Sequence, residues 1–332
     1  MTTVAVLLAG GAGTRLYPAS RPARPKQFLA FGDDDRPLLR RAADRAAFAD
    51  EVYAVTPERF AEEVRDLVPE ATVLVEPAAR DTGPALAYAA HRVAAAVTDP
   101  VCCCLPADHV VGEDATEALE RGCRVAAEAD RLVTFGVVPT RPASEYGYVE
   151  RGADRGAYAD VAAFREKPTR ERARELVDAG CLWNAGIFAW RPAVFLEEAA
   201  RGPLAPVVDA LRDGDPVRGY DATDPVSVDR AVLERTDRAA VVPLDAAWDD
   251  VGSWDALARL LDLDAAGNVL ATDGLAIDAA GNVLASDDKH VSVVGVDDLV
   301  VAAYDDRVLV VPKAEAQRVR EVVAELRPDD GD

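Results

Sequence analysis

Short apolar runs alternate with helical patterns over the first half of the chain. "VAVLLAG", "VYAVT", "TVLVEP" and "VCCCLPAD" have the continuous hydrophobic character of buried strands. Segments with helical spacing follow, among them "PERFAEEVRDLV", where Pro57 is suited to the first helical turn. Repeated strand–helix units predict an α/β fold with a mostly parallel sheet flanked by helices. Ligands bind such sheets beyond the carboxyl ends of the strands, where the Gly10 loop, Asp108 and "EYGYVE" are expected.

The pattern changes after about Leu263. "GNVLA" occurs at Gly267 and again at Gly281, and several short β-type runs follow before the helix-like "AEAQRVREVVAEL". A series of β-hairpins and a few turns of a β-helix both fit this pattern. We therefore predict a larger domain over residues 1–262 and a small β-rich domain with a terminal helix over residues 263–332. The tail "RPDDGD" is expected to fray.

The chain is strongly acidic, with 59 Asp and Glu against 37 Lys and Arg and a formal net charge of -22. This charge opposes binding to nucleic acid. The acids are spread along the whole chain, and only four of the 37 cations are lysine, which suggests a surface adapted to high salt. The sequence has no apolar run long enough for a membrane span and no leader-like start, so a cytoplasmic location without a membrane partner is predicted.

Three of the five cysteines, Cys102, Cys103 and Cys104, stand in a row within a predicted strand. Neighbouring side chains on a strand point to opposite faces, so the three are poorly placed to bind one metal ion. Free cysteine is among the most buried residue types. We expect buried thiols and no disulfide framework.

The stretch "LLAGGAGTRLYPASRPARPKQFL" is rich in glycine and carries four cations and no acid. Glycines let backbone N–H groups approach an anion, and Arg15 and Lys26 add positive charge. The dinucleotide fingerprint needs a third glycine where Leu16 stands. The Walker loop needs Gly-Lys five residues after its first glycine, and counted from Gly10 that position is Arg15. We predict an anion-binding site that matches neither of these two motifs. A tight turn with solvent-facing cations is the alternative.

This stretch resembles the signature of sugar-nucleotide pyrophosphorylases, and its extension through "PKQFL" resembles the mannose-1-phosphate guanylyltransferases. The resemblance continues in order through "EPAARDTGPAL", "LPADHVV", "YGYVE", "FREKP", "WNAGIFAW" and "WDDVGSW". It implies a Rossmann-like nucleotidyltransferase domain followed by a short β-helical part, left-handed in form, through which a homodimer could assemble. Longer relatives carry a fused isomerase module, for which too few residues remain here, so one activity is expected.

The implied reaction joins GTP and mannose 1-phosphate to give GDP-mannose and pyrophosphate. The resemblance assigns nucleotide binding to Leu8, Ala9, Gly10, Gly11, Gly13, Thr14, Arg15, Lys26, Arg80, Thr82 and Gly83. Arg15 would stabilise the departing pyrophosphate, and Lys26 would contact phosphates nearer the reacting centre. The family usually has Asn where this chain has Asp81, which weakens the expected contact with the base because an ionised carboxylate cannot donate a hydrogen bond.

The resemblance makes Asp108 and Asp250 a metal-binding pair, and Mg²⁺ suits two carboxylates plus phosphate oxygens. Together with Arg15 and Lys26 they form the predicted catalytic set. Without the resemblance, Asp108 is equally well explained as a loop acid or a helix cap. Ser253 is interpreted as the N-cap of the helix-like "WDALARLL".

The sugar phosphate would be bound by Gly147, Glu166, Lys167 and Asn184, with Lys167 as its cation. Two alternatives stay open. One is the same chemistry on another sugar phosphate or nucleotide, such as glucose 1-phosphate. The other is a non-catalytic sugar-nucleotide sensor, which is disfavoured because the chain keeps Arg15 and both metal carboxylates.

Overall fold

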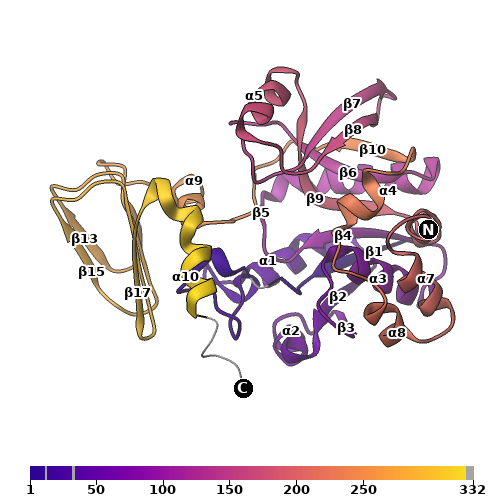
Figure 1. Cartoon of the computed structure of the whole chain (residues 1–332), viewed down its shortest axis with the longest axis horizontal. Coiled ribbons are helices and arrows are strands. Elements are labelled where there is room, and N and C mark those ends of the chain that lie inside the picture. Colours follow the sequence, from indigo (N-terminus) through magenta and orange to yellow (C-terminus); the bar gives the residue numbers. More distant parts are fainter. Residues whose placement is uncertain (12, 32–33, 327–332) are drawn as a thin grey trace. The chain divides into compact units, whose positions relative to one another are not determined.

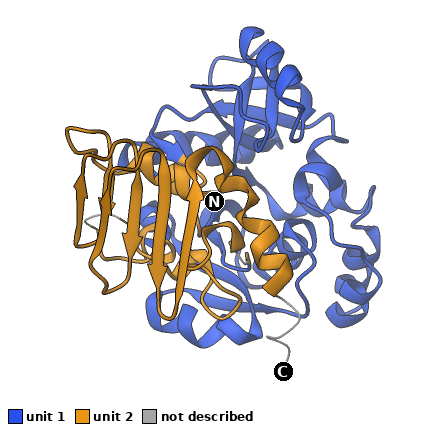
Figure 2. Cartoon of the chain, turned by 60° about the vertical axis from the view of Figure 1, so that its left-hand side comes forward, with its two compact units in different colours: residues 1–10, 42–107, 111–248 blue, residues 11–41, 108–110, 249–332 orange. Residues whose placement is uncertain are grey.

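The computed structural model describes residues 1–11, 13–31 and 34–326, and the predicted frayed tail lies outside them. The chain forms two compact units (Figure 2). Unit 1 comprises residues 1–10, 42–107 and 111–248, and unit 2 comprises residues 11–41, 108–110 and 249–332. Unit 2 thus joins the glycine-rich opening to the C-terminal part. The predicted boundary between residues 262 and 263 groups the chain differently and stays a prediction.

Unit 1 is built on a nine-stranded sheet in the order β3-β2-β1-β4-β9-β6-β10-β8-β7 (Figure 1). Its strands are β1 (Thr2–Leu8), β2 (Glu51–Pro57), β3 (Thr72–Glu76), β4 (Pro100–Pro106), β6 (Leu132–Val137), β7 (Tyr148–Asp154), β8 (Ala159–Arg165), β9 (Leu182–Trp190) and β10 (Ala239–Pro243). The first four strands pair in parallel, as the alternation of strands and helices predicts. The expected α/β fold is confirmed.

The helices of unit 1 connect these strands. They are α1 (Leu38–Arg45), whose first residues belong to unit 2, α2 (Ala61–Leu67), α3 (Thr82–Ala96), α4 (Thr116–Ala129), α5 (Arg170–Asp178), α6 (Pro192–Ala199), α7 (Ala205–Arg212) and α8 (Pro216–Asp221), followed by a π-helical turn (Asp229–Leu233). The prediction for Pro57 is wrong: this residue ends β2, and α2 begins only at Ala61, after a 3₁₀ turn over Glu58–Phe60. Its backbone is extended, which the preceding strand favours over a helical start.

The second half of the sheet is largely antiparallel, and it closes on itself. Strand β9 pairs with β6 along most of its length but also with β7 at its start. Strands β9, β6, β10, β8 and β7 therefore form a closed ring of pairings. Tyr148 of β7 lies opposite Arg165 of β8 and Trp183 of β9. This register brings the neighbouring residues Gly147, Glu166 and Asn184 to one end of the ring.

All five cysteines are buried and free, which confirms that prediction. The run Cys102–Cys104 lies in β4 between β1 and β9. Among residues 1–11, 13–31 and 34–326, no helix combines the length and apolar character needed to cross a membrane. Two-residue strands β5 (Val110–Val111) and β11 (Trp248–Asp249) complete this part of the chain.

Unit 2 contains the β-rich C-terminal part. Its strands are β12 (Val269–Ala271), β13 (Gly274–Ile277), β14 (Val283–Ser286), β15 (Val291–Val294), β16 (Leu299–Tyr304) and β17 (Arg307–Pro312), and its helices are α9 (Leu257–Leu260) and α10 (Val319–Leu326). Strands β12, β14 and β16 stack in parallel, as do β13 and β15. Parallel stacking of successive turns is the arrangement of a β-helix, and it rules out a simple series of hairpins.

The 14-residue echo of "GNVLA" corresponds to one turn of this stack. Asn268 and Asn282, both buried, form a ladder in which Asn282 Nδ2 donates to Asn268 Oδ1 at 2.9 Å. Val269, Val283 and Val300 lie in register on one face. That face packs against residues of the N-terminal segment, including Leu16 and Phe31, in one hydrophobic core. The β-helix therefore supports the glycine-rich opening of the chain.

Candidate active site

Lys26 is a buried cation in unit 2 that contacts both predicted metal ligands. Its side chain is 6% exposed, and its Nζ lies 2.8 Å from Asp108 Oδ2. The same Nζ donates a hydrogen bond to the main-chain oxygen of Asp250 at 2.5 Å. A buried ammonium is costly unless it is paired, and these two contacts meet that need. Three residues from distant motifs thus meet at one point, and the catalytic roles assigned to them stay a prediction.

The glycine loop lets Lys26 lie close to the backbone. Gly13 has a φ of 56°, in the left-handed region, and a Cβ at this position would overlap Lys26 Cβ. Ser20 Oγ donates to the main-chain oxygen of Gly13 at 2.5 Å and holds the turn. Glycine is therefore required here for both conformation and space.

Asp108 follows β4 and carries a negative charge stabilised by its neighbours. Burial opposes its ionisation, but the Lys26 ammonium and His109 outweigh this effect and hold the pKa of Asp108 below its usual value. His109 Nε2 lies 3.7 Å from Asp108 Oδ1, and burial lowers the pKa of the imidazole. Sequence reasoning assigned no role to His109, although its position beside Asp108 was a signal.

The two adjacent acids Asp249 and Asp250 have different partners. Asp249 is 6% exposed and accepts from Arg259 Nε at 2.7 Å and Nη2 at 3.2 Å, a forked ion pair. Asp250 Oδ1 accepts from the Gly252 N–H at 3.0 Å, and its main chain contacts Lys26. Asp249 is thus engaged by Arg259, and the choice of Asp250 as the metal ligand stays a prediction.

The interpretation of Ser253 as a helix cap is corrected in part. Ser253 does precede a 3₁₀ turn (Trp254–Ala256), but its hydroxyl makes no capping hydrogen bond. Instead Ser253 Oγ donates to Asp255 and accepts from Gln317 Nε2 at 2.7 Å. The competing carboxylate of Asp255, two residues away, takes the hydroxyl that would otherwise cap the turn.

Arg15 lies in the 3₁₀ turn Thr14–Leu16 and is partly exposed. Within the described part of the chain, its guanidinium forms no ion pair or hydrogen bond. Arg21 differs, because it donates to the main-chain oxygen of Tyr304 at 3.0 Å and pairs with Asp305 at 3.1 Å. Of these two loop cations, Arg15 is the one whose donors remain for an anionic ligand.

The donor set at Asp108 and Asp250 suits a magnesium ion completed by its substrate. Among the residues described, no cluster of three or more His, Cys, Asp or Glu side chains is arranged to hold a metal. Mg²⁺ typically takes one or two protein carboxylates, several waters and phosphate oxygens. The pair therefore fits a metal that arrives with a triphosphate better than a permanently bound ion.

The predicted sugar-phosphate residues meet at one end of the β7–β8–β9 ring in unit 1. Gly147, Glu166 and Asn184 each adjoin one of the paired positions Tyr148, Arg165 and Trp183, and Asn184 N–H donates to Gly147 O at 2.9 Å. A Cβ on Gly147 would lie 2.7 Å from Glu166 Oε2, so a larger residue would displace the Glu166 carboxylate. Lys167 is exposed, and its Nζ lies 2.8 Å from Glu166 Oε1. The register brings all four residues together.

The polar groups of Thr82 and Gly83 are engaged within unit 1. Gly83 N–H donates to Val226 O at 3.0 Å, and Thr82 Oγ1 accepts from Val228 N–H at 3.0 Å. A Cβ on Gly83 would lie 2.6 Å from Val226 O. These contacts anchor the segment around Val226 to the start of α3, and nucleotide binding by the two residues stays a prediction.

The surroundings of Asp81 account for an aspartate at this position, where the family usually has asparagine. It has a φ of 70°, and its Oδ1 accepts from the Thr82 N–H at 2.7 Å at the start of α3. A carboxylate is favourable at a helix N-terminus. The Asp81 carboxylate is therefore engaged at the start of α3. Arg80 is partly exposed, and its side-chain donors have no partner among the described residues.

Glu76 is a further residue of this region that sequence reasoning did not assign. It ends β3 and is 7% exposed, and burial raises its pKa to about 7. A Cβ on Gly10 would lie 3.0 Å from Glu76 Oε1, so the carboxyl faces the loop that follows β1. The main chain before this loop is held by β2, since Ala9 N–H donates to Val55 O at 2.9 Å. The only sequence signal was its place at the head of "EPAARDTGPAL".

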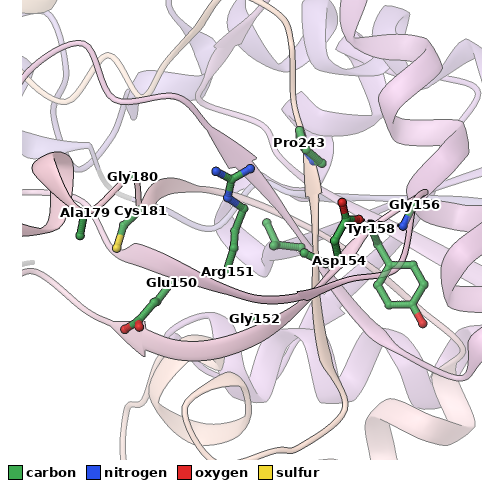
Figure 3. A pocket seen from close by; sticks show the side chains of 12 residues that line it. Glu150, Arg151, Gly152, Asp154, Gly156, Tyr158, Ala179, Gly180, Cys181 and Pro243 are labelled. Carbon is green, nitrogen blue, oxygen red and sulfur yellow. Dashed lines mark hydrogen bonds between the residues drawn. The ribbon is translucent and has the colours of Figure 1, made fainter.

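A cavity of about 490 Å³ lies at the other end of the β7–β8 hairpin (Figure 3). It is lined by Glu150, Arg151, Asp154, Tyr158 and Cys181, together with seven smaller or apolar residues. None of the predicted site residues lines it. This hollow of unit 1 is therefore separate from the residues predicted to carry the chemistry.

The fold is that of a nucleotide-transferring class of enzymes, and comparisons with known proteins agree. A family model described as nucleotidyl transferase matches residues 4–266, and one described as a mannose-phosphate isomerase/GMP-like β-helix domain matches residues 263–326. The mannose-1-phosphate guanylyltransferase of Escherichia coli (strain K12) is 37% identical over 98% of this chain and 73% of its own length. The xanthan biosynthesis protein XanB of Xanthomonas campestris pv. campestris (strain B100) is 38% identical over 97% of this chain and 73% of its own length.

A crystal structure from Thermus thermophilus, described as a mannose-1-phosphate geranyltransferase, superposes with a TM-score of 0.92. It is 36% identical and covers 98% of this chain and 99% of its own. This chain belongs to the nucleotidyl transferase family, in the branch of the mannose-1-phosphate guanylyltransferases.

Proposed function

We propose that this enzyme transfers GMP from GTP to α-D-mannose 1-phosphate and releases pyrophosphate. Relatives across nearly the whole chain are described as mannose-1-phosphate guanylyltransferases, which supports the substrate pair. The observation that carries the proposal is the buried Lys26 ammonium beside Asp108 and the Asp250 main chain, preceded by a glycine loop whose Arg15 has no side-chain partner among the described residues. A buried cation that contacts one carboxylate and the main chain of a second acidic residue suits a triphosphate and its metal ion.

The reaction needs little covalent help from the protein. A phosphate oxygen of the sugar phosphate attacks the α-phosphorus of GTP, and the bond from that phosphorus to the bridging oxygen of pyrophosphate breaks. Lys26 and Arg15 neutralise charge on the phosphates, so less repulsion opposes the incoming anion. Glu166 and Asn184 hold the sugar hydroxyls, so the sugar phosphate is bound in a fixed orientation relative to the nucleotide. Asp108 and Asp250 would hold Mg²⁺, which supplies further charge neutralisation on the phosphates.

The direct test measures pyrophosphate release with a panel of sugar 1-phosphates against GTP, ATP, UTP and dTTP in the presence of Mg²⁺. The highest kcat/KM is expected for mannose 1-phosphate with GTP. A higher value for another pair would reassign the substrates while keeping the chemistry. Binding of sugar nucleotides without any turnover would instead favour a sensor.

Glu76→Gln is expected to weaken discrimination between GTP and ATP. An ionised Glu76 can accept hydrogen bonds from the N1–H and N2–H groups of guanine, which adenine lacks in that arrangement. Because the pKa of Glu76 is about 7, the wild-type KM for GTP should rise as the pH falls below 7. The variant should lose about 1–3 kcal/mol of preference, or roughly 5- to 150-fold, and show a flat profile. Unchanged nucleotide preference at pH 8 would remove Glu76 from base recognition.

Four finer points also belong to this proposal. The catalytic metal is Mg²⁺ or another divalent cation, and removal by EDTA should abolish turnover. A homodimer is expected, which light scattering of the full chain would test. The acidic surface is adapted to salt, so activity should fall in very dilute buffer. The free buried cysteines agree with a cytoplasmic location.

A further inference from the structure

Asn184 has an amide whose orientation is fixed by its neighbours. Its Oδ1 accepts from Thr134 Oγ1 at 2.7 Å and from the Gly186 N–H at 3.1 Å. A backbone N–H can only donate, so the carbonyl oxygen must face Gly186 and the amide nitrogen must point the other way. Gly186 has a φ of 69°, next to an irregularity in the β6–β9 pairing. The sequence of β9 thus determines which end of the amide faces the sugar-phosphate residues.

The amide nitrogen of Asn184 donates to Asp229. The distance from Asn184 Nδ2 to Asp229 Oδ1 is 2.9 Å. With both lone pairs of Oδ1 used and one N–H given to Asp229, a single amide N–H is left without a partner among the described residues. Asn184 can therefore offer a substrate one donor and no acceptor.

From this geometry we propose that Asp229 is a positioning residue of the sugar-phosphate site, which fixes the Asn184 amide and sets the charge that the sugar phosphate meets. The inference rests on the proposed function. Asp229 begins the π-helical turn Asp229–Leu233, and its own segment is tied to α3 through the Val228 N–H and Thr82 Oγ1. The carboxyl is thus held by the fold and not by a flexible loop.

The charge around Asp229 explains the second part of the proposal. The charged groups acting on it are Glu166 and Lys167, which directly follow β8. Helices α3 and α6 also pack against the turn; α3 contributes the uncharged Thr82, and the buried Glu198 of α6 is paired with Arg201 and Arg238. Burial and the Glu166 carboxylate raise the pKa of Asp229 to about 7. With Asp229 protonated, Glu166 and Lys167 sum to zero charge; with it ionised, the sum is negative.

A sugar 1-phosphate is an anion, so it should bind better when Asp229 is protonated. Because the pKa of Asp229 is raised to about 7, the protonated carboxyl that favours binding is present below about pH 7 and is lost as the pH rises through this value. A residue that only stabilised the fold would not link KM for one substrate to pH in this way. The pH profile of that KM therefore separates positioning from simple structural support.

The experiment compares wild type, Asp229→Asn and Asp229→Ala with mannose 1-phosphate and GTP between pH 6 and 9. Wild-type KM for the sugar phosphate should rise about tenfold per pH unit above 7 if binding needs the proton. Asp229→Asn still accepts from Asn184 and cannot ionise, so its KM should stay flat. Asp229→Ala frees the amide and also cannot ionise, so its KM for the sugar phosphate should stay flat with pH at about tenfold above the wild-type value measured at pH 6, with KM for GTP unchanged.

Glu198→Gln is the matched control. Glu198 is 8% exposed and in unit 1, but it faces Arg201 and Arg238, at 2.5 and 3.2 Å. This variant should keep the wild-type profile. A wild-type slope in Asp229→Asn, or an Asp229→Ala protein with both KM values unchanged, would overturn the proposal. If mannose 1-phosphate is not turned over by wild type, the proposed function fails, and the same ratios are measured with the best sugar phosphate of the panel.

Discussion

Asp250→Asn is expected to lower kcat by about 10³-fold while the chain keeps its fold. Asparagine retains an oxygen that can accept from the Gly252 N–H, which Asp250 Oδ1 binds at 3.0 Å. The contact of Lys26 is with the main chain of residue 250 and survives the change. What is lost is one of the two negative charges that are proposed to hold a divalent cation. The loss should appear in kcat and in the concentration of Mg²⁺ needed for half-maximal rate.

Asp249→Asn provides the matched control one residue away. Asp249 is paired with Arg259, whose pKa is raised mainly by that carboxylate in spite of burial. Its substitution should lower the free energy of unfolding by about 1–3 kcal/mol and leave kcat within a few-fold of wild type. Thermal unfolding and initial rates on both variants distinguish the two roles. Equal losses of kcat in the two variants would contradict the assignment of Asp250 as the metal ligand.

Two carboxyl groups with a pKa near 7 place opposite demands on the enzyme. Glu76 is proposed to act ionised toward guanine, and Asp229 is proposed to act protonated toward the sugar phosphate. The rate at low substrate concentrations should therefore peak near pH 7. Both pKa values are raised by folding, so the stability these groups contribute is fully present below about pH 4 and is lost as the pH rises through 7.

The sequence indicated candidate site residues where the local chemistry was distinctive. The glycine loop, its cations and the acid before "VGSW" are all residue types with few structural uses in combination. It also predicted the 14-residue repeat of the β-rich part. Residues whose environment depends on long-range packing were missed: His109, Glu76 and Asp229 are ordinary in sequence, and their pKa values are shifted only by burial and neighbours in the folded chain.

The division of the chain was beyond sequence reasoning for a related reason. Hydrophobic periodicity reports that Leu16, Trp254 and Val300 are buried, but not that they share one core. That core joins the glycine-rich opening to the β-helix, two segments near opposite ends of the sequence. Local patterns give each element its type, while partner choice depends on complementary faces that only the folded chain brings together.

Val300→Asp tests this shared core and is expected to remove both stability and activity. Val300 is fully buried in the stack with Val283, within the core that includes Leu16 and Trp254. An unpaired carboxylate there should cost about 4 kcal/mol or more. Val308→Asp, on the neighbouring strand but 67% exposed, is the control and should change little. Thermal unfolding and GTP turnover are measured on both variants. A stable, active Val300→Asp protein would show that the β-helix does not support the glycine loop. Loss of stability and turnover in this variant alone would show that activity depends on the β-helix.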